Sequence, residues 1–330
     1  MERNPVYDRA KGIGMILVIY GHMFMYGGIP FSIIFSFHMP MFFIISGMLL
    51  SSDKFNSMSS FSWVKVCLKK YMPPFVFFSV LGGIVRILYS GSIDYKGVIS
   101  QLIFHIGSDE LFTGALWFIG ILMVSMFLMP LLNKWGGQKT ISQILVLLTL
   151  VIISYILSEI PITPPFLIKI IPGVLFFVYL GFIWKKSIMN TIVDKQFKRF
   201  MVFGFPIFIL LSLLNKTINI SVPVYNDGIV FLICALYGTM LVLTISCHRM
   251  PKLIEYLGKN SLVVFSLHAI WITMVTEAFN YLFGTSYIPM ENLPIHLVLV
   301  GGVIVIAMTV LSTALVLPVY NSTLKLLKLK

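Results

Sequence analysis

The sequence predicts an all-α, polytopic integral membrane protein of about ten transmembrane helices, with its N- and C-termini in the cytoplasm. Hydrophobic residues make up 58% of the 330 positions and charged residues 11%, whereas soluble domains contain about 45–50% apolar and about 25% charged residues. Apolar runs long enough to cross a bilayer recur along the whole chain, without a long linker between them. We therefore expect residues 1–330 to form a single membrane-embedded domain that crosses the cell (cytoplasmic) membrane several times.

The expected spans follow one another closely along the chain. They lie at residues 11–28, 31–50, 74–90, 111–132, 143–160, 170–184, 200–214, 228–247, 260–283 and 294–318. Helix-breaking residues separate several of them: Gly27, Gly28 and Pro30 follow the first span, and Pro73 and Pro74 precede the third. The first span is not expected to be a cleaved signal peptide, because the mixed-charge sequence MERNPVYDRAK precedes it and no A-x-A-like cleavage site precedes the next span.

The basic residues indicate how the chain is oriented. The formal net charge is +12, but Lys and Arg fall in short clusters between apolar runs, which is typical of loop anchors and not of a nucleic-acid-binding surface. A cytoplasmic N-terminus places most of the 24 Lys and Arg residues inside, with Lys96, Lys169 and Lys216 outside and Arg86 within the third span. So uneven a division supports the orientation and an even number of helices.

Cysteine spacing excludes two common kinds of site. Cys67, Cys234 and Cys247 are far apart and lie in or near apolar runs, so they form neither a CxxC metal pair nor a disulfide framework. We interpret them as small hydrophobic residues. No metal site is expected.

The first span contains the residues most indicative of chemistry. Asp8, Lys11 and His22 are ionisable residues on or beside a membrane helix, where such groups are costly and usually face the interior of a bundle. Lys11 and His22 are eleven residues apart, so they return to within roughly 20° of one helix face, about 16 Å apart along the axis. Asp8, Met15 and Val18 share this face. The alternative is a snorkelling lysine and a histidine that only packs.

The second span places another histidine at a similar depth. His38 lies eight residues after the turn at Pro30, as His22 lies eight residues before it. In an antiparallel hairpin the two imidazoles can share one proton, or one can orient the other so that it keeps a basic nitrogen. Pro40 can kink the helix beside the pair, and Ser46-Gly47 permits a close helix approach or a hydroxyl contact. Simple packing of His38 is the alternative.

These two segments resemble a known family. The sequences DRAKGIGMILVIYGH and FSFHMPMFFIISGML are similar to membrane acyltransferase family 3, particularly its fucose 4-O-acetylase-like branch. The family's hallmark is a basic residue, usually Arg, followed after ten residues by a catalytic His. Here Lys11 and His22 occupy these positions, so the spacing matches but the bidentate geometry of Arg is lost. The close similarity covers about the first 50 residues.

The resemblance implies an activity and its substrates. Family members move acyl groups, typically acetyl from acetyl-CoA, onto sugars of surface polysaccharides, so we expect an acyl-CoA co-substrate, a glycan acceptor and no permanently bound cofactor. Acyl-CoA is expected to enter from the cytoplasm past Asp8 and Lys11. His22 is expected either to deprotonate the sugar hydroxyl or to carry the acyl group, and His38 to orient it or share its proton.

Weaker similarities to the family extend the candidate site. They are ALWFIGILM around Trp117, GVLFFVYLGFIWKK, and GKNSLVVFSLHAIWI around His268. Trp117 and His268 are therefore expected, with Lys11, to contact the acyl donor. An interfacial anchor for Trp117 and a helix-to-helix hydrogen bond for His268 are the alternatives. Glu277 lies nine residues after His268, on the opposite helix face, and is expected to pair with Arg86.

Two other classes of function remain open from the residues alone. A histidine–lysine stripe in a bundle of ten helices also fits a proton-coupled transporter of a sugar or an anion. Paired broken helices in repeated halves, which are frequent in transporters, are not found in the sequence. A non-catalytic membrane subunit is the third class, but it gives Lys11 and His22 no role.

Overall fold

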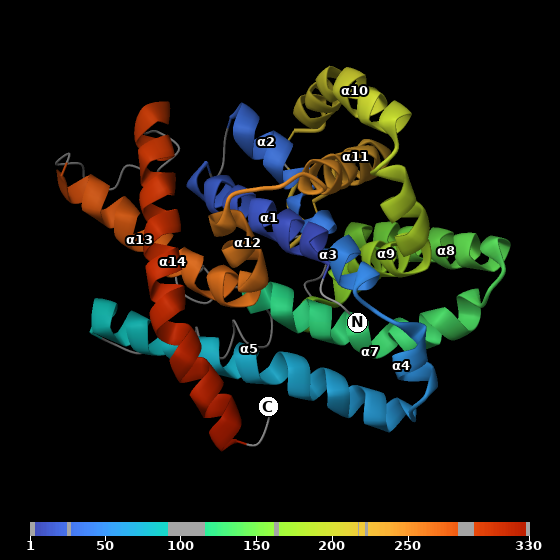
Figure 1. The fold of residues 1–330 in the computed structure, drawn as a ribbon, viewed down its shortest axis with the longest axis horizontal. Helices are drawn as coiled ribbons and strands as arrows, with labels where there is room; N and C mark the ends of the chain where they lie inside the picture. The colour runs from blue at the N-terminus through green and yellow to red at the C-terminus, as the bar shows by residue number, and fades with distance from the viewer. Residues whose placement is uncertain are drawn as a thin grey trace.

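The computed structural model describes residues 4–24, 28–91, 116–161, 165–216, 218–221, 224–282 and 294–327. These residues form an all-helical protein, as predicted, without a β-strand in the described ranges apart from one isolated bridge between Asn219 and Val224. Figure 1 shows the helices as one bundle, in which α1 lies centrally. Gly27, Lys96 and the start of the span predicted at 111–132 lie outside the described residues.

Within the described ranges, nine helical segments are long and apolar enough to cross a membrane. They are α2 with α3 (Ile29–Phe35 and His38–Met48), α5 (Ser60–Ser90), α7 (Trp117–Gly136), α8 (Thr140–Glu159), α9 (Ile171–Thr191), α10 (Lys195–Leu214), α11 (Gly228–Ser246), α13 (Ser261–Leu282) and α14 (Ile295–Leu326). Three shorter elements connect them: α4 (Ser52–Asn56), the 3-10 helix η2 (Pro165–Ile170) and α12 (Lys252–Lys259). The protein is therefore a polytopic membrane protein.

The first expected span corresponds to α1 (Pro5–Met23). It contains 19 residues and begins at the Asn4 side chain, which accepts a hydrogen bond from the Val6 amide. Asp8, Arg9 and Lys11 lie in its first two turns, so it is less apolar than the nine other segments. A tenth membrane crossing, by α1, remains a prediction.

The prediction that the third span begins at Pro74 is wrong. Helix α5 begins at Ser60 and continues through Pro73 and Pro74. The cause is a buried stripe at i, i+4 and i+8, formed by Trp63, Cys67 and Tyr71, which are 5%, 2% and 5% exposed. The Trp63 indole donates a hydrogen bond to the Met126 carbonyl of α7 at 2.8 Å. This packing extends the helix on the N-terminal side of the prolines.

The second span is interrupted immediately before His38. α2 ends at Phe35, and α3 begins at His38. Pro40 explains the position of the break, because proline has no amide hydrogen and its ring clashes with the carbonyl four residues earlier, here that of Ser36. The kink expected beside His38 is therefore present, and it places this imidazole at the first position of α3.

Helices α3 and α9 cross at very short range. A Cβ on Gly47 would lie 1.9 Å from the Val178 carbonyl oxygen, and one on Gly181 would lie 2.1 Å from that of Ile44. Only glycine permits this approach at either position. Ser46 donates its hydroxyl back to the Phe42 carbonyl at 2.8 Å. The close approach expected at Ser46-Gly47 is confirmed, and it fixes α3, with His38 at its start, in the middle of the bundle.

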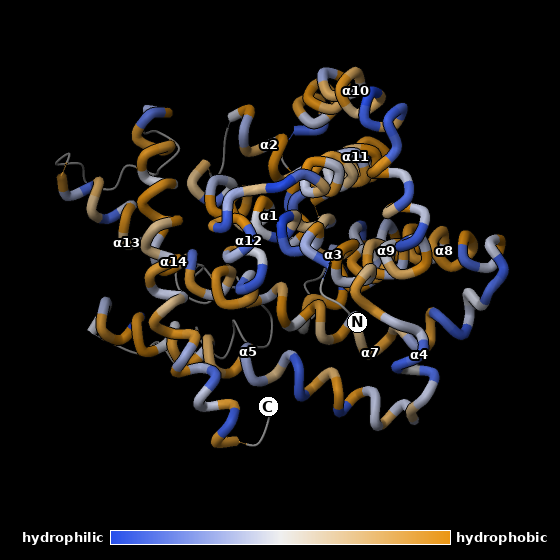
Figure 2. The backbone as a smooth tube through the Cα atoms, viewed as in Figure 1, coloured by the Kyte–Doolittle hydropathy of each residue, from blue (hydrophilic) through white to orange (hydrophobic). Residues whose placement is uncertain are grey.

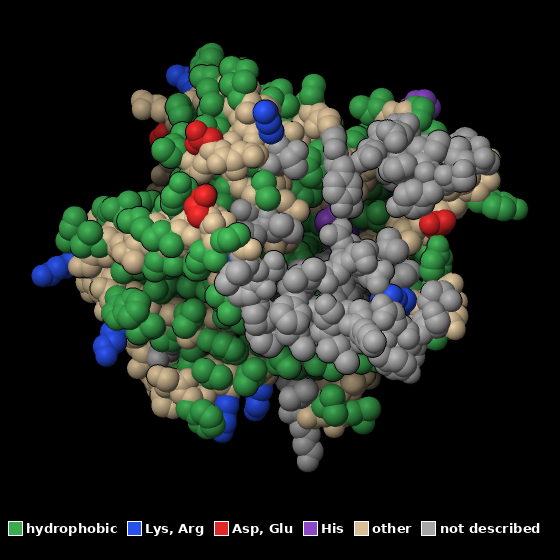
Figure 3. All heavy atoms as spheres, turned by 180° about the vertical axis from the view of Figure 1, so that it is seen from behind, with side chains coloured by type: hydrophobic (Ala, Val, Ile, Leu, Met, Phe, Trp, Pro, Cys, Tyr) green, Lys and Arg blue, Asp and Glu red, His purple; other side chains and the backbone are tan. Residues whose placement is uncertain are grey.

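The outer surface is suited to lipid. Large apolar side chains are exposed along several helices, including Phe203 (78%) and Val202 (70%) on α10 and Leu315 (75%) on α14. In Figure 2 the helices are mostly hydrophobic, and hydrophilic residues gather in connections such as that between α7 and α8. Figure 3 shows hydrophobic side chains over much of the visible surface that is not drawn grey. Exposed apolar area of this extent is expected only where lipid replaces water.

Candidate functional site

Helix α1 carries the main candidate residues at opposite ends. Asp8 lies in its first turn and His22 in its last. Asp8, Met15 and Val18 are all buried, which confirms that the face predicted from the spacing points into the protein. A Cβ on Gly14 or Gly21 would meet side chains of the second span at 3.0 Å or less. The C-terminal half of α1, which carries His22, therefore packs tightly on the segment that contains His38.

Three imidazoles from three different helices meet at the end of α1. The rings of His22 and His268 (α13) have centroids 5.3 Å apart. Phe35 contacts both His22, at 6.1 Å, and His38, at 4.7 Å, between centroids. His22 also lies within electrostatic range of both other histidines. The structure thus places His22, His38 and His268 in one cluster, here called the imidazole cluster.

Backbone carbonyls orient two of these rings. His38 Nδ1 lies 2.8 Å from the Ile34 carbonyl oxygen, and His268 Nδ1 lies 2.6 Å from that of Phe265. A carbonyl oxygen only accepts hydrogen bonds, so in each neutral ring Nδ1 carries the hydrogen and Nε2 is left as the acceptor. His268 is completely buried, and its Nε2 has no hydrogen-bond partner among the described residues.

Trp117 belongs to an aromatic wall beside this cluster. His268 contacts Phe265 (5.4 Å between centroids), Phe265 contacts Phe118 (5.1 Å), and Phe118 contacts Trp117 (6.3 Å). Phe43 of α3 completes the wall, 6.5 Å from Trp117. The indole is therefore linked to His268 through two phenylalanine rings. Its expected contact with an acyl donor remains a prediction.

The other end of α1 forms a charged group, here called the mouth. Lys11 Nζ lies 3.1 Å from Asp8 Oδ1, and the two side chains are 19% and 4% exposed. Asp8 is buried and Lys11 is partly buried, so water screens the attraction between the two charges less than in a surface ion pair. Lys11 and Asp8 are thus adjacent, as expected.

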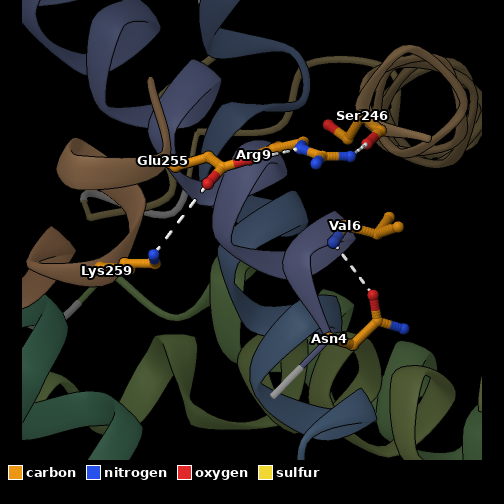
Figure 4. A network of polar contacts seen from close by, with 6 residues as sticks. All are labelled: Asn4, Val6, Arg9, Ser246, Glu255 and Lys259. Atoms are coloured by element: carbon orange, nitrogen blue, oxygen red, sulfur yellow. Dashed lines mark hydrogen bonds and ion pairs between the residues drawn. The ribbon is translucent and has the colours of Figure 1, made fainter. Parts of the chain in front are cut away.

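Sequence reasoning missed a second ion-pair network at the mouth (Figure 4). Arg9 Nε donates to Glu255 Oε1 at 2.9 Å, and Arg9 Nη1 donates to the Ser246 carbonyl at 3.5 Å. Lys259 Nζ lies 4.0 Å from Glu255 Oε2. The i,i+4 pair of Glu255 and Lys259 in KLIEYLGK was the available signal, since it predicts a short amphipathic helix between two spans. Arg9 therefore faces this network.

Helix α12, which carries Glu255, touches the backbone of α1. A Cβ on Gly12 would lie 2.0 Å from the Ile254 carbonyl oxygen, and one on Gly258 would lie 1.6 Å from that of Asp8. Glycine on both helices is therefore required for this contact. α12 holds the first turns of α1 in place, and with them Asp8 and Lys11.

Glu277 is separated from the imidazole cluster. It hydrogen-bonds with Tyr89 of α5, which agrees with its expected position on the opposite face of α13 from His268. Arg86 lies on the same helix as Tyr89, and its pairing with Glu277 remains a prediction. In the described part of the chain, no group of three His, Cys, Asp or Glu residues is arranged to hold a metal ion.

Comparison with known protein families identifies the type of domain. A family model described as an acyltransferase domain matches residues 4–316, which include the imidazole cluster, the aromatic wall and the mouth. No curated protein and no solved structure matches the chain.

Proposed function

The chain belongs to acyltransferase family 3, and from this premise we propose that it is a membrane O-acyltransferase of the fucose 4-O-acetylase-like branch. Its donor is an acyl-CoA, with acetyl as the favoured acyl group, and its acceptor is a sugar hydroxyl of a surface polysaccharide or a lipid-linked precursor. Family membership favours this function over the transporter and over a non-catalytic subunit, because neither alternative performs acyl transfer.

The observation that carries the proposal is the position of His22. It is the half-buried member of the imidazole cluster, whereas His38 and His268 are 3% and 0% exposed. A substrate therefore meets His22 first. Its imidazole can take a proton from a sugar hydroxyl, or it can attack the thioester and carry the acyl group. His268 provides a neutral acceptor beside it, and His38 lies on the other side of Phe35.

The mouth is the proposed entry for the donor. Lys11 supplies a positive charge for the phosphates of coenzyme A, and Asp8 holds the lysine at 3.1 Å. The spacing between Lys11 and His22 gives about 16 Å along the helix, which is a suitable length for an extended pantetheine arm. Trp117 and the aromatic wall are proposed to line the acyl end of the path.

The proposed orientation can be tested by thiol labelling. Cys67, Cys234 and Cys247 are first replaced by Ser or Ala, and single cysteines are then placed at Asn226, before α11, and at Lys195, the first residue of α10. An impermeant reagent added to intact cells should label the cysteine at Asn226 and not the one at Lys195. The opposite pattern would contradict donor entry from the cytoplasm.

The function itself is tested on the host's surface glycans. The masses of the surface glycans are compared by mass spectrometry for cells with the gene, without it, and with the gene restored. Loss of an acetyl or related ester substituent, with the glycan otherwise intact, is the expected result. Loss of the whole glycan would instead favour transport.

A further inference from the structure

The second imidazole of the cluster has an unsatisfied atom beside the candidate catalytic residue. His268 is completely buried in the middle of α13, and its Nδ1 is bound to the Phe265 carbonyl. Its Nε2 is buried and has no hydrogen-bond partner in the part of the chain that the structure describes. A buried acceptor of this kind costs folding free energy, so it is a feature that packing alone does not favour.

The geometry indicates which donor this nitrogen can serve. The His22 and His268 rings are 5.3 Å apart between centroids and inclined at 41°. Two imidazoles joined by one N–H···N hydrogen bond have centroids about 5 Å apart. The separation of the two rings therefore suits one N–H···N hydrogen bond from a His22 ring nitrogen to His268 Nε2 when these two atoms face each other.

We propose that His268 is a positioning residue for His22, which it holds through a hydrogen bond from a His22 ring N–H to His268 Nε2. The inference rests on the proposed acyltransferase function and deepens it. The Phe265 carbonyl fixes the His268 tautomer, His268 fixes that of His22, and the second His22 nitrogen is thereby kept basic and directed at the substrate. This is the logic of a catalytic base oriented by a third group.

The proton can be followed through the reaction. The sugar hydroxyl gives its proton to the basic nitrogen of His22 as its oxygen bonds to the acyl carbon. The C–S bond of the thioester breaks, and the departing thiolate takes that proton from His22, which forms CoA-SH. His268 gains and loses no atom, but its lone pair stabilises the positive charge on His22 between these steps.

Other buried polar atoms do not share this position. Tyr179 Oη, Thr309 Oγ1 and Thr313 Oγ1 are also buried without a partner among the described residues, but they belong to α9 and α14, which carry none of the three imidazoles. His38 meets His22 through their common neighbour Phe35. Tyr179, which is 1% exposed, provides a matched control, because Tyr179→Phe also removes one buried, unpartnered polar atom.

The test compares His268→Phe, His268→Gln and Tyr179→Phe in inside-out membrane vesicles that contain their own glycan acceptors. Labelled acetyl-CoA is added, and kcat and KM are measured at equal protein content. His268→Phe should lower kcat by about 10²-fold or more, as expected for loss of an oriented base, with KM for acetyl-CoA unchanged. His268→Gln retains an acceptor oxygen, so its kcat should be at least about tenfold higher than that of His268→Phe. Tyr179→Phe should stay within about twofold of wild type.

Stability separates positioning from packing. His268→Phe keeps a planar ring at this buried position, so the amount of folded protein in detergent and its unfolding temperature should stay close to those of wild type. The inference is overturned if His268→Phe keeps more than about a third of kcat, if Phe and Gln variants lose activity equally, or if their losses follow a loss of folded protein. Failure of wild-type vesicles to transfer any label would overturn the proposed function as well, and so differs from all three outcomes.

Discussion

The polar side chains at the two ends of α1 have different kinds of partner. At the mouth, each of Asp8, Arg9 and Lys11 takes part in an ion pair, and α12 supplies the partner of Arg9. In the imidazole cluster, by contrast, His38 and His268 hydrogen-bond to backbone carbonyls, and Nε2 of His268 has no partner among the residues that the structure describes. Paired charges keep their protonation state, whereas neutral imidazoles can accept and return protons.

This difference assigns different tasks to the two ends. Substitutions in the imidazole cluster should act on the chemical step and change kcat. Substitutions at the mouth should act on donor binding or on the packing of α1, and should change KM or stability. The following variants test this division, from the largest expected effect to the smallest.

His22→Gln should remove nearly all acyl transfer. Glutamine keeps the size and hydrogen bonding of the side chain but has no basic nitrogen, and general acid–base catalysis contributes about 10²- to 10⁴-fold. Glycan acylation is measured in cells that lack the native gene and express the variant. The protein should insert at normal levels and still bind acyl-CoA. Retention of more than about a tenth of wild-type transfer would remove His22 from the chemical step.

Gly258→Ala should destabilise the mouth without touching a charged side chain. Its Cβ would lie 1.6 Å from the Asp8 carbonyl oxygen, so α12 must move away from α1, at a cost of about 1–3 kcal/mol. Gly83→Ala on α5 is the control, because no atom of the described residues lies within 4 Å of its Cβ. The thermal unfolding temperature in detergent should fall for Gly258→Ala. For Gly83→Ala it should stay equal to that of wild type or rise. Equal effects would exclude a tight α1–α12 contact.

Lys11→Ala should weaken use of the acyl donor more than Lys11→Arg does. Any cation at this position keeps its attraction to phosphate and its pair with Asp8, so Arg should retain most activity. Removal of the charge should raise KM for acetyl-CoA about tenfold, with a smaller change in kcat. If Lys11→Ala transferred at the wild-type rate at low donor concentration, this lysine would act only as a topology anchor.

The Arg9–Glu255 pair should have the smallest effect. The two side chains are 14% and 26% exposed, and partly solvated ion pairs contribute about 0.2–1 kcal/mol. A double-mutant cycle of Arg9→Ala and Glu255→Gln, measured by thermal unfolding, should give a coupling free energy in this range. Transfer should change little. A large loss of kcat in either variant would mean that the two ends of α1 are not separate in function.

Much of the fold could be predicted because most membrane helices are long, uninterrupted apolar runs. The spans predicted at 228–247 and 260–283 agree with α11 and α13 within one residue. The kink near His38 was also predictable, since Pro40 acts on its own backbone. Local chemistry of this kind is visible in sequence.

The parts that were missed depend on contacts between distant segments. Helix α5 continues through Pro73 and Pro74 because Trp63, Cys67 and Tyr71 pack on other helices. The 5.3 Å approach of His268 to His22 likewise depends on how α13 lies against α1. Spacing along one helix predicted the relation of Lys11 to His22, but it contains no information on a partner that lies 246 positions further along the chain.

The central claim is that a cytoplasmic acyl-CoA donates its acyl group to a glycan through the imidazole of His22. It is tested most directly in sealed inside-out vesicles, where acetyl-CoA labelled in the acetyl group reaches only the cytoplasmic face. Wild-type vesicles should place the label on glycan as a base-labile ester, and His22→Gln vesicles should place on it less than about a hundredth as much. Equal labelling by the two proteins, or no ester in wild-type vesicles, would contradict the account.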